Sequence, residues 1–120
     1  MKEYDIHLDE KFAPLTKIDV SAEAAAHQPW FNQTLTRVNE SVVRLGVLEG
    51  DFHWHKHDLE DEFFLVLEGR LIIEVEGREP VTLDPHQGYT VPRGVMHKPR
   101  AQGRTVVVMV ENATVKPTGD

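Results

Sequence analysis

The chain has 120 residues, of which 40% are hydrophobic and 28% charged, values that fit one globular domain and exclude a disordered or fibrous protein. The 13 Lys and Arg residues and the 20 Asp and Glu residues give a net charge of −7. An acidic chain without a polybasic patch repels phosphate groups, so neither a nucleic acid nor a membrane is an expected partner.

The absence of cysteine excludes disulfides, thiolate metal sites and a cysteine nucleophile, so any metal site must use nitrogen and oxygen ligands. The longest unbroken apolar runs, 63–67 and 106–110, have five residues each, whereas a membrane helix needs about 20. The first residues are charged and lack the apolar stretch of a signal peptide. We therefore expect a cytoplasmic protein.

The first element that the sequence predicts is a short helix over Ser21–His27. Ser21 is a suitable N-cap, the residues after it are mostly alanine, and Pro29 stops the helix.

From Trp30 onward the sequence predicts one strand after another, because segments rich in Val, Leu, Ile, Phe and Thr alternate with turn residues. Many short strands in a small chain indicate an all-β sandwich or barrel. The residues after Glu111 are expected to be poorly ordered. The predicted strands are 31–38, 41–48, 52–57, 62–68, 70–76, 80–83, 89–91, 97–101 and 105–111.

Three of the seven histidines, His53, His55 and His57, alternate along one of these predicted strands. Side chains alternate between the two faces of a strand, so the three imidazoles should point to one side. Successive ones start about 6.5–7 Å apart at the backbone, which is close enough for side chains to converge on one ion.

Two residues farther along the chain offer further ligands. Glu62 stands at the entrance of an apolar strand, where its carboxylate can face the same interior as the histidines. His97 begins a strand after the tight turn expected at Pro92 and Gly94, and antiparallel pairing can bring it close to the others.

Together these residues supply three nitrogens and one oxygen, a set that suits one divalent metal ion: iron, manganese, nickel, cobalt or zinc. Four protein ligands leave an octahedral metal with about two open positions for substrate, oxygen or water. The candidate ligands are His55, His57, Glu62 and His97.

The run from Gly50 to Gly69 resembles the first motif of the cupin superfamily, in which His-x-His is followed by Glu and, after six intervening residues, by Gly. His55, His57 and Glu62 fill that pattern, and the segment 92–97, Pro-x-Gly-x-x-His, resembles the second motif. The resemblance covers roughly residues 35–111 of a single domain that spans 1–120.

The sequence departs from the family pattern at three positions. Four residues rather than five separate Gly50 from His55, His86 stands where the second motif usually begins with Gly, and Ala101 stands where Asn often closes it. No departure removes a candidate ligand. Because His86 replaces a Gly, we expect its φ to be positive.

The resemblance implies a double-stranded β-helix, or jelly-roll barrel, with the metal inside it, and the predicted short helix lies N-terminal to this barrel. It also implies a homodimer. The interior of so short a barrel is small, so its ligand or substrate should be a small molecule.

Other residues are expected around the metal. We interpret His53 as a residue of the pocket wall and as a candidate general acid or base, and Glu62 as a second candidate for proton transfer. Phe64 and Val66 share the parity of Glu62, so they are expected to pack in the barrel interior and shape the pocket.

Tyr89 and Arg93 complete the expected pocket lining. Tyr89 lies before the second motif, where packing is the commoner role for a tyrosine. Arg93 lies in the turn before His97, where an arginine is either solvated or bound to a substrate carboxylate.

Three classes of function are compatible with this sequence. The first is a metalloenzyme that acts on a small organic molecule, with dioxygenase chemistry at a redox metal or isomerase or lyase chemistry at a Lewis-acid metal. The second is a non-catalytic protein that binds a small ligand, with or without metal. The third is a structural protein with an unused site. We favour the first.

Overall fold

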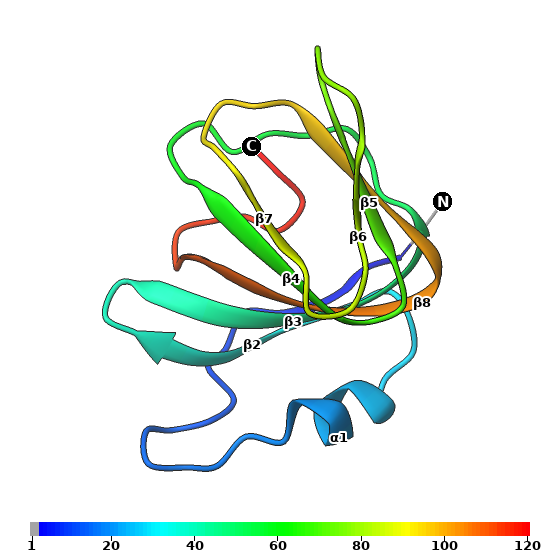
Figure 1. The fold of residues 1–120 in the computed structure, drawn as a ribbon. Helices are drawn as coiled ribbons and strands as arrows, with labels where there is room; N and C mark the ends of the chain where they lie inside the picture. Colours follow the sequence, from blue (N-terminus) through cyan, green and yellow to red (C-terminus); the bar gives the residue numbers. More distant parts are fainter. Residues whose placement is uncertain (1–2) are drawn as a thin grey trace.

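The computed structural model describes residues 3–120 and is built mainly from β-strands (Figure 1). The predicted all-β fold is confirmed. Two predicted strands, over 31–38 and 62–68, have the bounds that the structure gives them. The elements are β1 (Asp5–His7), α1 (Val20–Ala25), β2 (Phe31–Val38), β3 (Ser41–Asp51), β4 (Glu62–Glu68), β5 (Leu71–Val75), β6 (Val81–Leu83), β7 (Gly88–Val91) and β8 (His97–Asn112).

Strand β8 organises the sheet. Along one edge it pairs with β3, and along the other it pairs first with β5 and then with β4, all antiparallel. The β2, β7 and β6 strands extend these pairs, and β1 lies parallel to β2. In Figure 1 the strands β4–β7 rise on one side of β2 and β3, and α1 lies on the other.

Two apolar clusters hold this arrangement together. The cluster inside the barrel lies among β4, β5 and β8, whereas the second lies where α1 meets the outer face of β2 and β3. Neighbouring residues of β8 serve both, because Val106 belongs to the outer cluster and Val107 to the inner one. A strand covered on both faces favours a continuous apolar sequence, which accounts for Val106 and Val107, whereas Val110 at the end of the run is exposed.

The helix differs from its predicted bounds. It spans Val20–Ala25, and its N-cap is Asp19, whose Oδ1 accepts a hydrogen bond of 3.1 Å from the amide of Ala22. The prediction of Ser21 as the cap is wrong. Asp and Ser cap equally well, and the earlier residue starts the helix because Val20 packs against the outer cluster.

The prediction of a strand over residues 52–57 is also wrong. The β3 ladder ends with the pair Asp51 and Arg100, and the next paired residues, His55 and His97, are offset by one residue. Such a bulge breaks the alternation of side chains, because each one-residue shift exchanges the two faces of a strand. His53 therefore does not share a face with His55, contrary to the sequence pattern.

A bend replaces the predicted turn at Gln102 and Gly103. The two predicted strands 97–101 and 105–111 form one strand of 16 residues, in which Gly103 has a φ of 72°. The register with β3 shifts at the same place. His86 has a φ of 73°, as its place in the second motif predicts.

Residues 113–120 pack against the barrel, although the sequence predicts a poorly ordered end. Val115 is buried, and its carbonyl accepts a hydrogen bond of 2.8 Å from Arg44. The carbonyl of Thr118 accepts one of 2.7 Å from His53. The prediction is wrong because a distant buried arginine anchors this segment, which local composition does not reveal.

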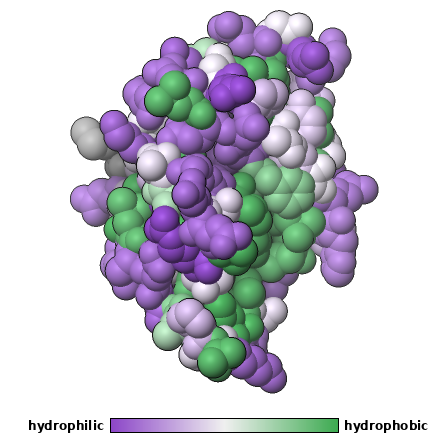
Figure 2. All heavy atoms as spheres, turned by 90° about the vertical axis from the view of Figure 1, so that its left-hand side faces the viewer, coloured by the Kyte–Doolittle hydropathy of each residue, from purple (hydrophilic) through white to green (hydrophobic). Residues whose placement is uncertain are grey.

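Figure 2 shows the face at the left of Figure 1, where hydrophilic and hydrophobic side chains both reach the surface. Among the residues that the structure describes, Trp54 and Leu59 are large apolar side chains that are exposed. The homodimer implied by the family resemblance stays a prediction. Among residues 3–120, no helix is long and apolar enough to cross a membrane.

The glycine that closes the first motif is expected to be irreplaceable. Gly69 has a φ of +80°, and a Cβ there would lie 2.6 Å from the carbonyl oxygen of Arg104. Gly77 has nearly the same φ, +79°, but open space around it. We expect Gly69→Ala to lower the free energy of unfolding by about 3 kcal/mol or more, and Gly77→Ala by about 1 kcal/mol. Urea denaturation measures both, and equal losses would contradict the steric argument.

Candidate metal centre

Four buried side chains meet inside the barrel. His55 and His57 come from the irregular segment after β3, Glu62 from the first residue of β4, and His97 from the first residue of β8. One nitrogen or carboxylate oxygen of each lies within 4.8 Å of those of the other three. The structure thus brings together the four residues that the two motifs nominate as ligands.

Backbone carbonyls orient two of the imidazoles. The Nδ1–H of His55 donates to the carbonyl of His53 at 3.0 Å, and the Nδ1–H of His97 donates to the carbonyl of Val95 at 2.9 Å. In a neutral ring that donates through Nδ1, the Nε2 atom carries the lone pair. Both rings therefore offer Nε2 as a ligand atom, and both are held by a carbonyl two residues earlier.

Four of the other polar atoms of the group lack hydrogen bonds. Both ring nitrogens of His57, the Oε1 of Glu62 and the Nε2 of His97 are buried and unpaired. Glu62 Oε1 lies 3.4 Å from His57 Nε2 and 3.5 Å from His97 Nε2. Unpaired buried polar atoms are costly, and a cation among them would satisfy most of them. Three imidazole nitrogens and one carboxylate oxygen therefore fit a divalent transition metal.

Burial and neighbouring charge act differently on the histidines. Burial, together with the nearby His97, lowers the pKa of His55 to about 4, so this ring is neutral at neutral pH. Burial opposes the charged form of His57 as well, but the adjacent carboxylate of Glu62 outweighs it and raises the pKa of His57 above its ordinary value.

A second carboxyl group lies beside Glu62. Glu111 on β8 is the direct cross-strand partner of Glu62 on β4, and both are buried. Burial and the Glu62 carboxylate raise the pKa of Glu111 well above its ordinary value. Burial also opposes ionisation of Glu62, but Glu111 and the two imidazoles lower the pKa of Glu62. The negative charge of the pair therefore resides on the residue that faces the histidines.

Arg44 holds Glu111 from the opposite side. Its Nη1 donates to Glu111 Oε2 and to the carbonyl of Val115, and its Nε donates to Thr34 Oγ1 at 3.0 Å. Only 2% of Arg44 is exposed. The sequence analysis missed this residue, because a single arginine within an apolar strand is ordinarily expected to point toward solvent.

His53 lies outside the group of four. Its Nε2–H donates to the carbonyl of Thr118, and its Nδ1 is 3.4 Å from the hydroxyl of Tyr4. Both ring nitrogens thus have partners, and the side chain is exposed. Its carbonyl orients His55, and the centroids of the His53 and His55 rings are 5.3 Å apart.

A small cavity of about 50 Å³ adjoins the centre on one side. His55 and Glu62 line it together with mostly apolar side chains, and Phe64 is the predicted pocket residue among them. None of these described lining residues is Lys or Arg. The others are Trp30, Asn32, Leu48, Phe52, Pro99, Met109 and Pro117.

The remaining residues expected in the pocket lie elsewhere. Val66 is fully buried in the inner apolar cluster, and Tyr89 packs against that cluster. The side chain of Arg93 is exposed, while its backbone N–H donates to Asp61 at 2.9 Å. The sequence analysis missed Trp30 and Pro117 because no motif includes them.

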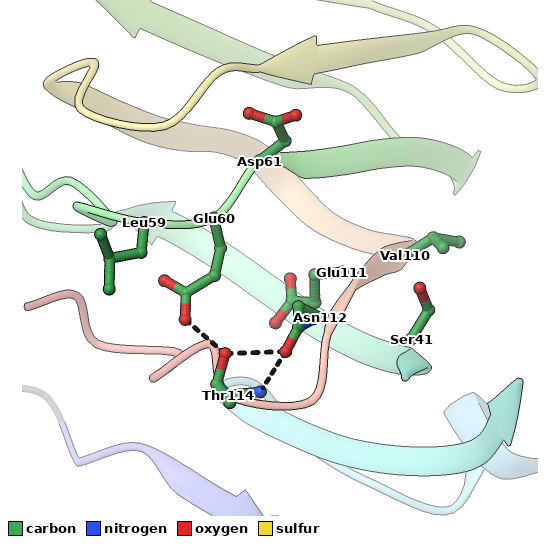
Figure 3. Close-up of a pocket in the computed structure, with 8 residues that line it drawn as sticks. All are labelled: Ser41, Leu59, Glu60, Asp61, Val110, Glu111, Asn112 and Thr114. Carbon is green, nitrogen blue, oxygen red and sulfur yellow. Dashed lines mark hydrogen bonds between the residues drawn. The ribbon is translucent and has the colours of Figure 1, made fainter. Parts of the chain in front are cut away.

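An open groove of about 540 Å³ lies outside the barrel, between the loop before β4 and the end of β8 (Figure 3). The acidic side chains of Glu60, Asp61 and Glu111 line it. In Figure 3, Glu60 points toward Thr114, whose hydroxyl donates to Glu60 Oε2. Glu111 therefore separates this groove from the Glu62 side of the buried centre.

The family model described as "Cupin domain" matches residues 41–111, which is more than half of the chain. The chain belongs to the cupin family. A curated relative of this cupin, "Uncharacterized protein YdbB" from Bacillus subtilis (strain 168), is 38% identical over 81 residues, which cover 68% of this chain and 72% of the relative.

Solved structures agree with the fold of this cupin. A cupin-2 domain containing protein from Shewanella frigidimarina is 31% identical, with a TM-score of 0.75 over 79% of this chain and 93% of that chain. Hydroquinone 1,2-dioxygenase from Sphingomonas sp. TTNP3 also has a TM-score of 0.75, over 85% of this chain and 33% of that chain. It is only 18% identical, so this likeness shows the fold alone.

Removing the arginine behind the centre should destabilise the protein strongly. Arg44→Met leaves the buried Glu111 and the carbonyl of Val115 without their partner, so we expect a loss of about 3 kcal/mol or more. The control is Arg37→Met, because Arg37 makes an exposed ion pair with Glu10 that contributes about 1 kcal/mol or less. Chemical denaturation of both variants measures the difference, and similar losses would contradict this role of Arg44.

Proposed function

We propose that this cupin is a metalloenzyme that acts on a small organic molecule at a centre of three histidines and one glutamate. The observation that carries the proposal is the set of buried, unpaired ligand atoms beside an apolar cavity. A bound divalent metal supplies either redox chemistry with oxygen or Lewis-acid polarisation of a carbonyl or hydroxyl group.

The residues of the chain would bind the ion, exclude water and transfer protons. His55, His57 and His97 hold the ion as neutral ligands, and Glu62 contributes one negative charge. The apolar walls exclude water, which strengthens electrostatic interactions with a bound substrate. We keep His53 and Glu62 as the proposed proton-transfer groups, with His53 acting from the rim of the site.

The chemistry of the cavity supports a neutral substrate. Its walls include the aromatic side chains of Trp30, Phe52 and Phe64, and the described lining has no cationic side chain to bind a phosphate or carboxylate. The Oδ1 of Asn32 is buried and has no hydrogen-bond partner, so it can accept a hydrogen bond from a substrate donor. Both the dioxygenase and the isomerase or lyase proposals are compatible with such a substrate.

A second candidate is a non-catalytic protein that binds a metal and a small ligand. The small size of the cavity, about 50 Å³, favours it, because an apolar cavity that holds benzene has about 150 Å³. Under this proposal the centre binds only a few atoms and releases them unchanged.

Elemental analysis of the purified protein, without a tag, is the first test. We expect roughly one iron, manganese, nickel, cobalt or zinc ion per chain, and almost none in His57→Ala, which removes one of four ligands. His7→Ala is the matched control, because His7 lies in β1 outside the group of four and should leave the metal content unchanged.

The identity of the metal then selects the activity assay. A redox metal calls for oxygen-uptake measurements, and zinc calls for isomerase and lyase assays. If the wild-type protein holds no metal, even after reloading with each of these ions, the metalloenzyme proposal is wrong. If it holds metal but converts no compound in either set of assays, the binding protein is the better description.

Metal affinity should fall as the pH is lowered from about 8 to about 6, because protons compete for the imidazole nitrogens. Competition should begin at His57, whose pKa lies above its ordinary value, and not at His55, whose pKa is about 4. Zinc titrations against a chelator across this range measure the effect. An affinity that is constant over the range would contradict it.

A further inference from the structure

His57 differs from the other two imidazoles of the centre. His55 and His97 each donate Nδ1–H to a backbone carbonyl, which fixes their tautomers. His57 makes no such bond, and its Nδ1 is buried without a partner. A ligand histidine needs an acceptor for its second nitrogen, because that acceptor decides which nitrogen keeps the lone pair.

Two carboxylates lie near His57 on the side away from the centre. Glu60 and Asp120 form a second group with His57, in which one potential ligand atom of each lies within 4.8 Å of those of the others. The Nε2 of His57 faces Glu62 at 3.4 Å, so Nδ1 is the nitrogen left for this acidic pair.

Both carboxylates are held by other parts of the chain. Glu60 Oε2 accepts a hydrogen bond from the hydroxyl of Thr114, as Figure 3 shows. Asp120 Oδ2 accepts one of 2.6 Å from the amide of Asp58. The amide of Asp120 in turn donates to the carbonyl of Lys56 at 3.0 Å. In each carboxylate one oxygen thus has a donor, and the other is available to His57.

We propose that Glu60 and Asp120 are positioning residues that accept the Nδ1–H of His57, directly or through one water, and thereby keep its Nε2 available to the metal. This inference rests on the proposed function, because it assigns the acidic pair a role at the same metal centre. It also makes the segment 113–120 part of that centre, since Asp120 and the Thr114 that holds Glu60 both belong to it.

Amide variants test the inference sharply. In Asp120→Asn and Glu60→Gln, the amide oxygen can keep the existing bond to Asp58 or Thr114, so that the NH₂ group faces His57. A donor at this place favours the opposite tautomer, in which Nε2 carries the proton and cannot bind metal. Loss of a partner of this kind typically weakens metal binding about 10–100-fold.

The experiment measures zinc affinity by chelator competition in the full chain and in the double variant Glu60→Gln, Asp120→Asn. The control is Asp58→Asn, which removes one negative charge, half the number lost in the double variant, from an exposed side chain of the same loop that pairs with Lys56. We expect a loss of about 10-fold or more in the double variant and less than about 3-fold in the control. Thermal unfolding of the metal-free proteins verifies that both variants are folded.

A second readout does not need metal. Long-range ¹H–¹⁵N NMR of the metal-free protein, recorded at a pH high enough for the His57 ring to be neutral, reports which ring nitrogen of His57 is protonated. We expect Nδ1–H in the wild-type protein and in Asp58→Asn, and a shift toward Nε2–H in the double variant.

The two readouts separate the possible failures. If the wild-type protein binds no zinc but the tautomer shifts in the double variant, the proposed function is wrong and the positioning of His57 stands. If zinc binds and the double variant matches Asp58→Asn in affinity, the positioning inference is wrong. It is equally wrong if affinity falls while the tautomer of His57 stays the same, because the carboxylates would then act only through their charge.

Discussion

The offset between two neighbouring backbone pairs determines the geometry of this site. Asp51 pairs with Arg100, but the next pair joins His55 to His97, so one strand carries an extra residue. The extra residue interrupts the backbone pairing between Asp51 and His55. His55 consequently lies against His97, and their ring centroids are 4.2 Å apart. Without the offset, the alternation of the strand would place His55 on the same face as the exposed Asp51 and His53.

The sequence predicts the ligands better than it predicts their surroundings. The first and last residues of two strands, 31–38 and 62–68, could be predicted because turn residues flank each strand and the apolar content of each is high. The candidate ligands could be nominated because their spacing follows two motifs. The bulge between Asp51 and His55 could not be predicted, since it depends on the register between segments more than 40 residues apart in the chain, which local alternation does not encode.

Three ionisable side chains lie one behind another on one side of the histidines. Glu62 faces the histidines, Glu111 stands across the strand pair from it, and Arg44 closes the series. Arg44 also donates to the carbonyl of Val115. The same side chain therefore holds both the carboxyl pair and the segment 113–120. No local pattern could reveal these contacts, because each joins residues from different strands or from the end of the chain.

The carbonyls of His53 and Val95 orient two of the three imidazoles, and every amino acid has a carbonyl. The orientation of these two imidazoles therefore depends on the conformation of the backbone and not on which residues stand at positions 53 and 95. His53→Ala and Val95→Ala would keep these carbonyls, so any effect of either substitution would come from the lost side chain and not from a lost orienting group. The two orienting hydrogen bonds by themselves therefore place no restriction on which amino acid stands at these positions.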